Sequence, residues 1–424
     1  MKRKEFLKNL KNLKNLKKVI TTAMIAVVVG GTAFAAATDM EPAKGNGYYM
    51  ATQPMQMSTG RYEAMGLAGV ALNNDQDALW TNPANLASDK WSWHLPSAAV
   101  TVYNVKDILK SDLAKDAVDG EMKDDMTGYA TDLIGIYGKA GYGEIARIDS
   151  TVGVKAPHFG FAGDVQLNLF TYVPSEDKTQ MSVIPQVDVG LSAGLGLSIM
   201  KGNPVSFDIG VTGRVAYRGY FSKLDMNTFL NASQSEDMMQ MLLDSTPVVA
   251  AMALPVDVGV NMNLPAGFSV GAVCRNLNGS YNTVSWYENV NAVSQNDFKE
   301  NPFKIEVKPS FDIGLAWQPD FGGWGWIAEP QVAVDLKNVD TAFKDGFTKE
   351  ALLQSLHAGV ELQFLKLVEV RAGVSGGYTT VGAGIDLLHL IHLEATYGHQ
   401  MFPLGNGTKN VDKLMIRANI LWER

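Results

Sequence analysis

Three short patterns in this chain carry residue types that do chemistry in other proteins. The segment 190–194 reads GLSAG and matches the nucleophile-elbow pattern of hydrolases, which places a serine on a sharp turn from strand to helix. Here Ser192 lies inside a long alternating segment and no helical pattern follows it. The elbow cannot form in that setting, so we expect no enzyme activity.

Metal-ligating types also occur in short patterns. His389 and His392 are three residues apart, and an odd spacing in a strand points the two side chains to opposite faces. Asp75 and Asp77 resemble part of a calcium loop, but the remaining ligands and the central glycine are missing. We therefore expect neither a metal nor a cofactor.

Arginines are the strongest candidates for binding an anion. Arg61, Arg214, Arg218 and Arg371 fall where an inward-facing guanidinium could hold the carboxylate of a ligand in a two-pronged pair. The alternative is that they pair with carboxylates of the chain itself. The candidates for such pairing are Asp208, Glu361, Glu369 and Asp386.

An apolar cluster marks the long connection at 221–246. Phe229, Met238, Met241 and Leu242 lie there in a stretch that is compatible with a helix. Methionine-rich surfaces adapt to varied apolar shapes, so these residues are candidate ligand contacts. A loop helix that packs its apolar face on neighbouring strands is the alternative.

Strict alternation of apolar and polar residues identifies the elements that position these side chains. From Val187 to Ile199 every second residue is apolar, and the residues between them are polar or glycine. This is the period of a strand. The run exceeds the roughly 9 to 11 residues with which a tilted strand crosses a bilayer, so we expect a transmembrane β-barrel.

The same reading gives an even number of segments, as a closed barrel of one chain requires. We predict an all-β fold with fourteen antiparallel strands, whose apolar face meets outer-membrane lipid and whose polar face lines the lumen. Tryptophans near the strand ends predict an aromatic belt: Trp91, Trp93, Trp317, Trp324, Trp326 and Trp422. The predicted strands are 91–105, 143–156, 158–173, 183–200, 204–220, 247–264, 266–276, 305–318, 326–337, 353–364, 367–375, 377–387, 390–401 and 411–423.

The first 35 residues read as a secretory signal peptide. Eight basic residues up to Lys18 precede an apolar stretch that ends in an Ala-x-Ala site at 33–35. Removing residues 1–35 takes eight basic and one acidic residue from 36 Lys and Arg and 44 Asp and Glu, which leaves a net charge of about −15. A nucleic-acid partner is therefore not expected, and the single Cys274 excludes an internal disulfide.

The segment between the signal peptide and the first strand, residues 36–90, is rich in Gly, Asn, Asp and Pro, which favours compact turns. Fourteen strands enclose a lumen that must be plugged or act as a pore. We therefore divide the chain into a signal peptide (1–35), an internal hatch (36–90) and a barrel (91–424). The expected hatch residues are Gly60, Arg61, Gly66, Gly69, Asn82, Pro83 and Ala84.

Within this segment, MGLAGVA at 65–71, DALW at 77–80 and NPANL at 82–86 resemble the hatch signature of the FadL superfamily. The resemblance implies a fourteen-stranded barrel with an N-terminal hatch in the outer membrane of a diderm bacterium. It also implies passive, hatch-gated transport or binding of long-chain fatty acids and similar hydrophobic small molecules. The family's gating kink lies in the third strand, where this chain has Gly160 and Gly163, although ordinary strand glycines are commoner.

A different function is compatible with the same signature. PorV-like barrels share it, and they dock periplasmic or secretion partner proteins instead of moving a small molecule. A general porin is a third reading. A lipid that copurifies would favour transport, a stable protein complex would favour docking, and ion conductance would favour a porin.

Overall fold

Within the described residues of the computed structural model, one antiparallel sheet closes on itself, because β1 pairs with both β2 and β18. The described residues are 53–55, 59–73, 77–111, 126–138, 141–174, 180–221, 224–225, 247–289, 292, 299–301, 304–325, 327–344, 346, 348–387, 390–401 and 412–423. The first strands are β1 (Ser92–Tyr103), β2 (Gly141–Ala156), β3 (Phe159–Val173), β4 (Ser182–Ile199), β5 (Ser206–Phe221), β6 (Leu224–Asp225), β7 (Val248–Ala253), β8 (Val256–Asn263) and β9 (Phe268–Leu277). The others are β10 (Thr283–Tyr287), β11 (Lys299–Asn301), β12 (Ser310–Trp317), β13 (Ala328–Leu336), β14 (Leu356–Phe364), β15 (Val368–Ser375), β16 (Tyr378–Leu387), β17 (Ile391–Gln400) and β18 (Asp412–Glu423).

These segments make a closed barrel of 14 strands. β7 and β8 both pair with β5, so they are two parts of one strand interrupted at Leu254 and Pro255. β10 pairs with β7 beyond the end of β9, and β11 pairs with β10. The predicted fourteen-stranded fold is thereby confirmed.

Alternating exposure along each strand shows that the apolar residues of the sequence pattern lie on the outer face of the barrel. In β4, Leu195 and Leu197 are 57% and 59% exposed, whereas Ser192 between the outward residues is fully buried. The outward faces of β3 and β8 are likewise apolar, and their inward faces carry Asp164 and Asn261. The outer surface is therefore a continuous apolar band of the kind that faces lipid in a membrane barrel.

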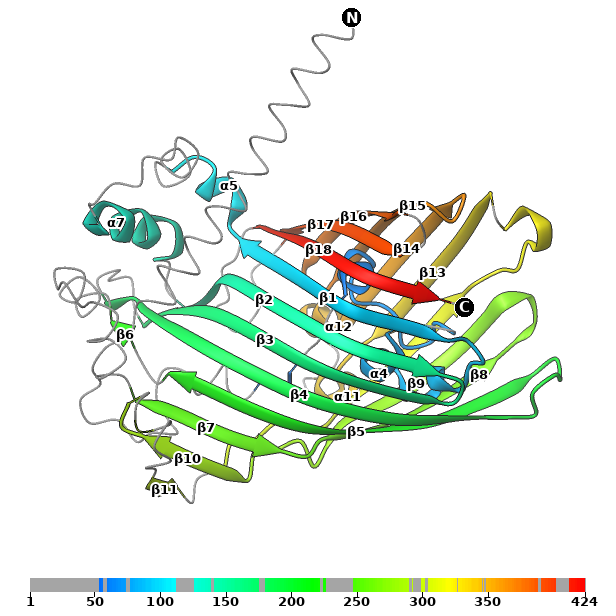
Figure 1. Ribbon diagram of the computed structural model, residues 1–424, viewed down its shortest axis with the longest axis horizontal. Helices are drawn as coiled ribbons and strands as arrows, with labels where there is room; N and C mark the ends of the chain where they lie inside the picture. Colours follow the sequence, from blue (N-terminus) through cyan, green and yellow to red (C-terminus); the bar gives the residue numbers. More distant parts are fainter. Residues whose placement is uncertain are drawn as a thin grey trace, which may run out of the picture.

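The two ends of the barrel differ. Short turns join strands at the end where the chain terminates, on the right in Figure 1. The longer connections, with α5 (Val105–Ile108) and α7 (Met126–Tyr137), lie at the opposite end. Trp91 and Trp93 are exposed beside the short-turn end, where an aromatic belt is expected.

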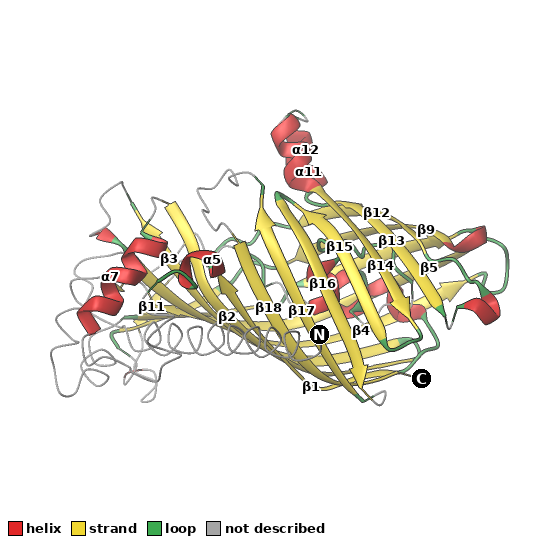
Figure 2. Cartoon of the chain, turned by 90° about the horizontal axis from the view of Figure 1, so that it is seen from above, coloured by secondary structure: helices red, strands yellow, loops and turns green. Residues whose placement is uncertain are grey.

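The wall is taller on one side than on the other. β4 has 18 residues and β12 has 8. Beyond β13, the helices α11 (Val339–Lys344) and α12 (Lys349–Ser355) project outward from the wall (Figure 2). No helix in the described part of the chain is long and apolar enough to cross a membrane.

The third strand pairs regularly with β4, from Phe159 to Tyr172, without a change of register. Its pairing with β2 shifts register between Glu144 and Ala146, far from both candidate glycines. Gly160 provides room for Leu79 and Leu86, since a Cβ there would lie about 3 Å from both side chains. Neither Gly160 nor Gly163 therefore coincides with an irregularity in the pairing.

The described residues 59–73 and 77–88, here called the interior segment, lie inside the barrel (Figure 1). They form α3 (Gly60–Ala64), α4 (Ala78–Thr81) and the 3-10 helix η1 (Pro83–Ala87). Thr59 caps α3 by accepting from the amide of Tyr62, 3.2 Å away. Asn82 caps η1, and Pro83 occupies its first position, where a missing amide hydrogen costs nothing.

Candidate functional site

Glycines of the barrel wall receive the backbone of the interior segment. A Cβ added at Gly210 would overlap the carbonyl of Pro83, and one at Gly359 would overlap that of Met65. Backbone approach this close is possible only where the wall has no side chain. The inward-facing glycines that read as ordinary strand residues are therefore contact positions for the interior segment. They include Gly160, Gly194, Gly196, Gly210, Gly259, Gly271, Gly314, Gly359, Gly373 and Gly382.

Two glycines expected in the hatch occupy the turn after α3. Gly66 has φ +67, and a Cβ there would overlap the carbonyl of Val374. Its own carbonyl lies 2.9 Å from Nδ1 of His357. The amide of Gly69 donates to Asp335 Oδ2 over 2.7 Å, so this turn is bound to the wall on both sides.

The Asn-Pro-Ala step is the most enclosed part of the interior segment. Asn82 is fully buried, and its Nδ2 donates to the carbonyls of Val70 (2.8 Å) and Val260 (3.2 Å). Its Oδ1 accepts from the amide of Ala84 over 3.0 Å. One side chain thus joins two parts of the interior segment to β8.

Ion pairs tie α3 to opposite parts of the wall. Arg61 donates to Glu361 (3.0 Å) on β14. Glu63 accepts from Arg147 (2.8 Å) on β2 and from Lys413 (2.6 Å) on β18. Because all these carboxylates are buried, removing one partner would leave a costly unpaired charge.

A further contact holds the chain just after the interior segment. Asp89 pairs with Lys201 in the short turn between β4 and β5. The hydrogen bond and charge of Lys201 lower the pKa of Asp89. Both residues are exposed, so this ion pair adds little to the stability of the fold.

The expected ligand arginines are largely engaged by the protein. Arg371 is enclosed by Glu361 (2.5 Å), Glu394 (2.7 Å) and Glu369. Arg218 is 1% exposed and pairs with Asp188 over 2.5 Å. Both adopt the ion-pairing role that the sequence left as the alternative.

Arg214 is placed differently, because it borders a cavity. Its Nε donates to Ser192 over 3.1 Å, and its Nη2 lies 3.5 Å from Asp257. Ser192 is therefore an inward hydrogen-bonding residue in the middle of β4, with none of the turn geometry of a nucleophile elbow.

The cavity measures about 530 Å³ and lies between the interior segment and the side of the wall formed by β5, β8, β9, β12 and β13. Arg275 fixes its base by donating to the carbonyls of Trp80 (2.6 Å) and Thr81. Lys337 bonds the hydroxyl of Tyr62 and stands over its ring. The residues that line it are Gln53, Pro54, Met55, Tyr62, Leu67, Trp80, Arg214, Asp257, Arg275, Asn276, Glu306, Lys308, Ser310, Asp312, Lys337 and Asn338.

One cation in this lining differs from the others. Lys308 is exposed, and no ion pair or hydrogen bond engages its side chain among the described residues. Sequence reasoning missed it, together with Arg275 and Lys337. Alternation places Arg275 and Lys337 on the inward face, but nothing in the sequence singles them out from other inward residues.

Some expected positions lie outside the described residues. These are the signal peptide, Asp75, His389 and the four candidate ligand contacts Phe229, Met238, Met241 and Leu242.

No family model matches this sequence, and no curated protein matches it. Solved structures do resemble it, at low identity. The toluene transporter TodX of Pseudomonas putida has a TM-score of 0.42 at 10% identity, and the alignment covers 88% of this chain and 99% of TodX. The toluene transporter TbuX of Ralstonia pickettii has a TM-score of 0.39 at 10% identity, with 88% and 98% covered.

A FadL homologue of Pseudomonas aeruginosa resembles the chain to the same degree, with a TM-score of 0.39 at 11% identity and coverage of 88% and 98%. The strand pairing described above establishes the barrel without these comparisons. The solved structures that this chain resembles thus include two toluene transporters and a FadL homologue, all at about a tenth sequence identity.

Proposed function

We propose that this protein is an outer-membrane transporter or binder of hydrophobic small molecules of the long-chain fatty acid type, and that the interior segment is its gate. The observation that carries the proposal is the 530 Å³ cavity, which is bounded on one side by the interior segment. Its volume is in the range of sites for small ligands. The outer apolar band supports a position in a membrane.

The lining of this cavity fits an amphipathic molecule. Met55, Leu67 and Trp80 offer apolar contacts, and each methylene that they bury contributes about 0.8 kcal/mol. Lys308 offers an unengaged ammonium to a carboxylate at the other end of such a molecule. The solved structures that the chain resembles include two toluene transporters and a FadL homologue, which is compatible with a hydrophobic cargo.

The fixed contacts of the interior segment bear on mechanism. A cargo held by many apolar contacts dissociates slowly unless its site changes shape. The interior segment forms part of the cavity lining through Tyr62, Leu67 and Trp80, so its displacement would open the cavity and release the cargo. We therefore assign gating to residues 59–88, with Gly60, Arg61, Gly66, Gly69, Asn82, Pro83 and Ala84 as the contacts that must yield.

The test is uptake of labelled oleate into liposomes that contain the purified protein, with and without a disulfide across the gate. Val70 and Gly314 are the pair chosen for such a disulfide, because a Cβ at Gly314 would lie 2.9 Å from Cβ of Val70. The same Cβ would overlap Oδ1 of Asp335, so this carboxylate must shift in both variants that carry Gly314→Cys. A modest separation brings this pair to the usual Cβ spacing of about 3.5–4.5 Å. Cys274 is replaced by serine in every variant to prevent mispairing.

We expect uptake by the reduced double-cysteine protein, loss of uptake on oxidation, and recovery with reductant. The two single-cysteine variants are the controls, because they carry the same side-chain changes without the bond, and oxidation should leave their uptake unchanged. Uptake by the oxidised protein would place the exit outside the interior segment. No uptake above empty liposomes by a folded barrel would instead favour the PorV-like alternative, in which the barrel docks protein partners.

A further inference from the structure

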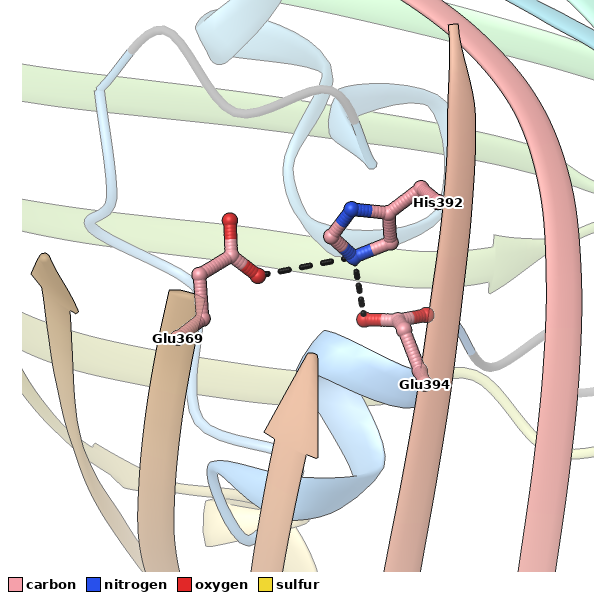
Figure 3. Close-up of side chains that lie close together, drawn as sticks. All are labelled: Glu369, His392 and Glu394. Carbon is pink, nitrogen blue, oxygen red and sulfur yellow. Dashed lines mark ion pairs between the residues drawn. The ribbon is translucent and has the colours of Figure 1, made fainter. Parts of the chain in front are cut away.

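Three buried side chains on neighbouring strands converge beside the interior segment. Glu369 lies on β15, and His392 and Glu394 lie on β17, with β16 between them. Figure 3 shows both carboxylates directed at the same ring nitrogen of His392. Nε2 of His392 is 3.4 Å from Glu369 Oε2 and 3.4 Å from Glu394 Oε1. Alternation places His392 and Glu394 on one face of their strand, but only strand pairing brings Glu369 to them.

We propose that Glu369, His392 and Glu394 bind a divalent transition-metal ion of the zinc type. One ligand atom from each residue lies within 4.8 Å of the others. Zinc binds imidazole nitrogen and carboxylate oxygen at about 2.0–2.2 Å, and adjacent ligands of a tetrahedral site are then roughly 3.3–3.6 Å apart. The two observed separations of 3.4 Å agree with that spacing.

Gly384, on the intervening β16, keeps a side chain away from these donors. A Cβ there would lie 2.9 Å from Glu369 Oε2, 3.1 Å from His392 Nε2 and 3.3 Å from Nη1 of Arg371. Any side chain at this position would therefore crowd two of the three donors.

The charges around the cluster also favour a bound cation. Three buried carboxylates, Glu361, Glu369 and Glu394, face two guanidinium groups, Arg61 and Arg371. These five groups carry a net charge of −1, which attracts a cation, because buried charges are stable only when they are paired. A divalent ion exceeds this charge by one unit.

Arg371 does not exclude the ion. It pairs with Glu394 Oε1 and Glu369 Oε2, the same oxygens that face His392. A carboxylate oxygen has two lone pairs, so it can accept from a guanidinium and bind a metal together. Glu369 is held from its other side by Gln363, whose amide donates to Oε1 over 2.9 Å.

The position of the cluster gives an ion a route and a role. Glu369 and His392 are each the second residue of their strand, next to the short-turn end of the barrel, and the side chain of Glu369 is 11% exposed. Glu394 packs on the start of α3, where a Cβ at Gly60 would lie 2.5 Å from Oε2. Metal bound here would fix a wall residue that supports the interior segment, whatever the barrel transports.

The test is zinc binding to the full chain, purified in detergent, stripped with a chelator and analysed by equilibrium dialysis against Zn²⁺. We expect saturation near one zinc per chain. His392→Gln and Gly384→Ala should each weaken binding at least tenfold. Gly384→Ala keeps all three donors, and its added methyl group crowds Glu369 Oε2 and His392 Nε2. It therefore remains informative if His392→Gln fails to fold.

His399→Gln is the matched control, because His399 lies on the same strand at its far end. It should bind zinc as the parent does. A folded parent that binds no zinc would overturn the proposal and leave a proton on His392 as the balancing charge. Unchanged binding by both His392→Gln and Gly384→Ala would overturn it as well, by placing the zinc elsewhere.

Discussion

At the scale of single residues, glycines of the barrel wall determine where the interior segment can contact it. Gly210, Gly359 and Gly373 face backbone atoms of the interior segment that a methyl group would displace. The Asn-Pro-Ala step supplies the complementary surface, since Asn82 satisfies its polar atoms within the contact. Close backbone contact of this kind makes docking sensitive to one added carbon.

Gly66→Ala tests that sensitivity. Alanine at φ +67 costs roughly 1–2 kcal/mol from the backbone alone, and its Cβ would also overlap the carbonyl of Val374. Gly202 shares a positive φ of 87 but has nothing within 4 Å of its Cβ position. In denaturant unfolding we expect Gly66→Ala to lose at least about 1 kcal/mol more than Gly202→Ala. Equal losses would mean that the contact with β15 contributes nothing.

Lys308→Met tests the electrostatic part of the cavity. An exposed ammonium paired with a carboxylate contributes up to about 1 kcal/mol, so oleate should bind up to about fivefold more weakly to the variant. Oleyl alcohol carries no charge and should bind the variant and the parent alike. The measurement is displacement of a fluorescent fatty acid, and an equal loss for both ligands would assign Lys308 a packing role instead.

At the scale of elements, the interior segment is held by bonds that reach into several strands. The turn after α3 depends on β13, where Asp335 Oδ2 accepts from the amides of Gly69 (2.7 Å) and Val70 (3.0 Å). α3 itself is tied to β2, β14 and β18. Displacing the interior segment would break several of these contacts together, so its position in the structure is a stable one.

Asp335→Ala should loosen the turn after α3. It leaves two buried amides without an acceptor, at about 1–3 kcal/mol each. Asp320→Ala removes a similar bond, to the amide of Gly322 (2.7 Å), in an exposed turn where water replaces the carboxylate. We expect faster proteolysis of the interior segment and lower stability only in Asp335→Ala. Equal protease resistance of the two variants would contradict the assigned role of β13.

The strands could be predicted from the sequence because their pattern is local. Alternation from Val187 to Ile199 fixes both the strand and its outward face without knowledge of any neighbour. The contacts inside the lumen are not local. Lys413 and Glu63 are 350 residues apart and meet only because the last strand closes the barrel beside the interior segment.

The same reasoning explains what was missed at the site. Inward positions such as Arg275 follow from alternation, but which inward residues become neighbours depends on register between strands. β7 and β8 keep one register with β5, whereas the pairing of β8 with β9 shifts register between Val256 and Val258. A local shift of this kind changes which inward side chains meet. The resemblance of 65–86 to a hatch signature located the interior segment, whereas its charged partners came only from the structure.

At the scale of the whole molecule, the outer surface decides where the protein resides. Large apolar side chains cover the outside of nearly every strand, including Leu195, Val211, Val260 and Leu315. In water, protein molecules with such a surface would aggregate through their apolar side chains. In a bilayer, lipid chains cover the same side chains. The barrel, its interior segment and the cavity between them therefore form one unit whose stability depends on lipid.

Leu195→Arg tests the position of the bilayer. Leu195 is 57% exposed and lies near the middle of the part of β4 that is needed to span a membrane, counted from the short turn at 200–205. Arginine facing lipid at that depth costs about 2–4 kcal/mol and about 0–1 kcal/mol near the interface. Met200, 54% exposed in the turn, is the matched site. Folding into lipid vesicles should be strongly reduced for Leu195→Arg and nearly unchanged for Met200→Arg, while equal effects would require a different membrane position for the barrel.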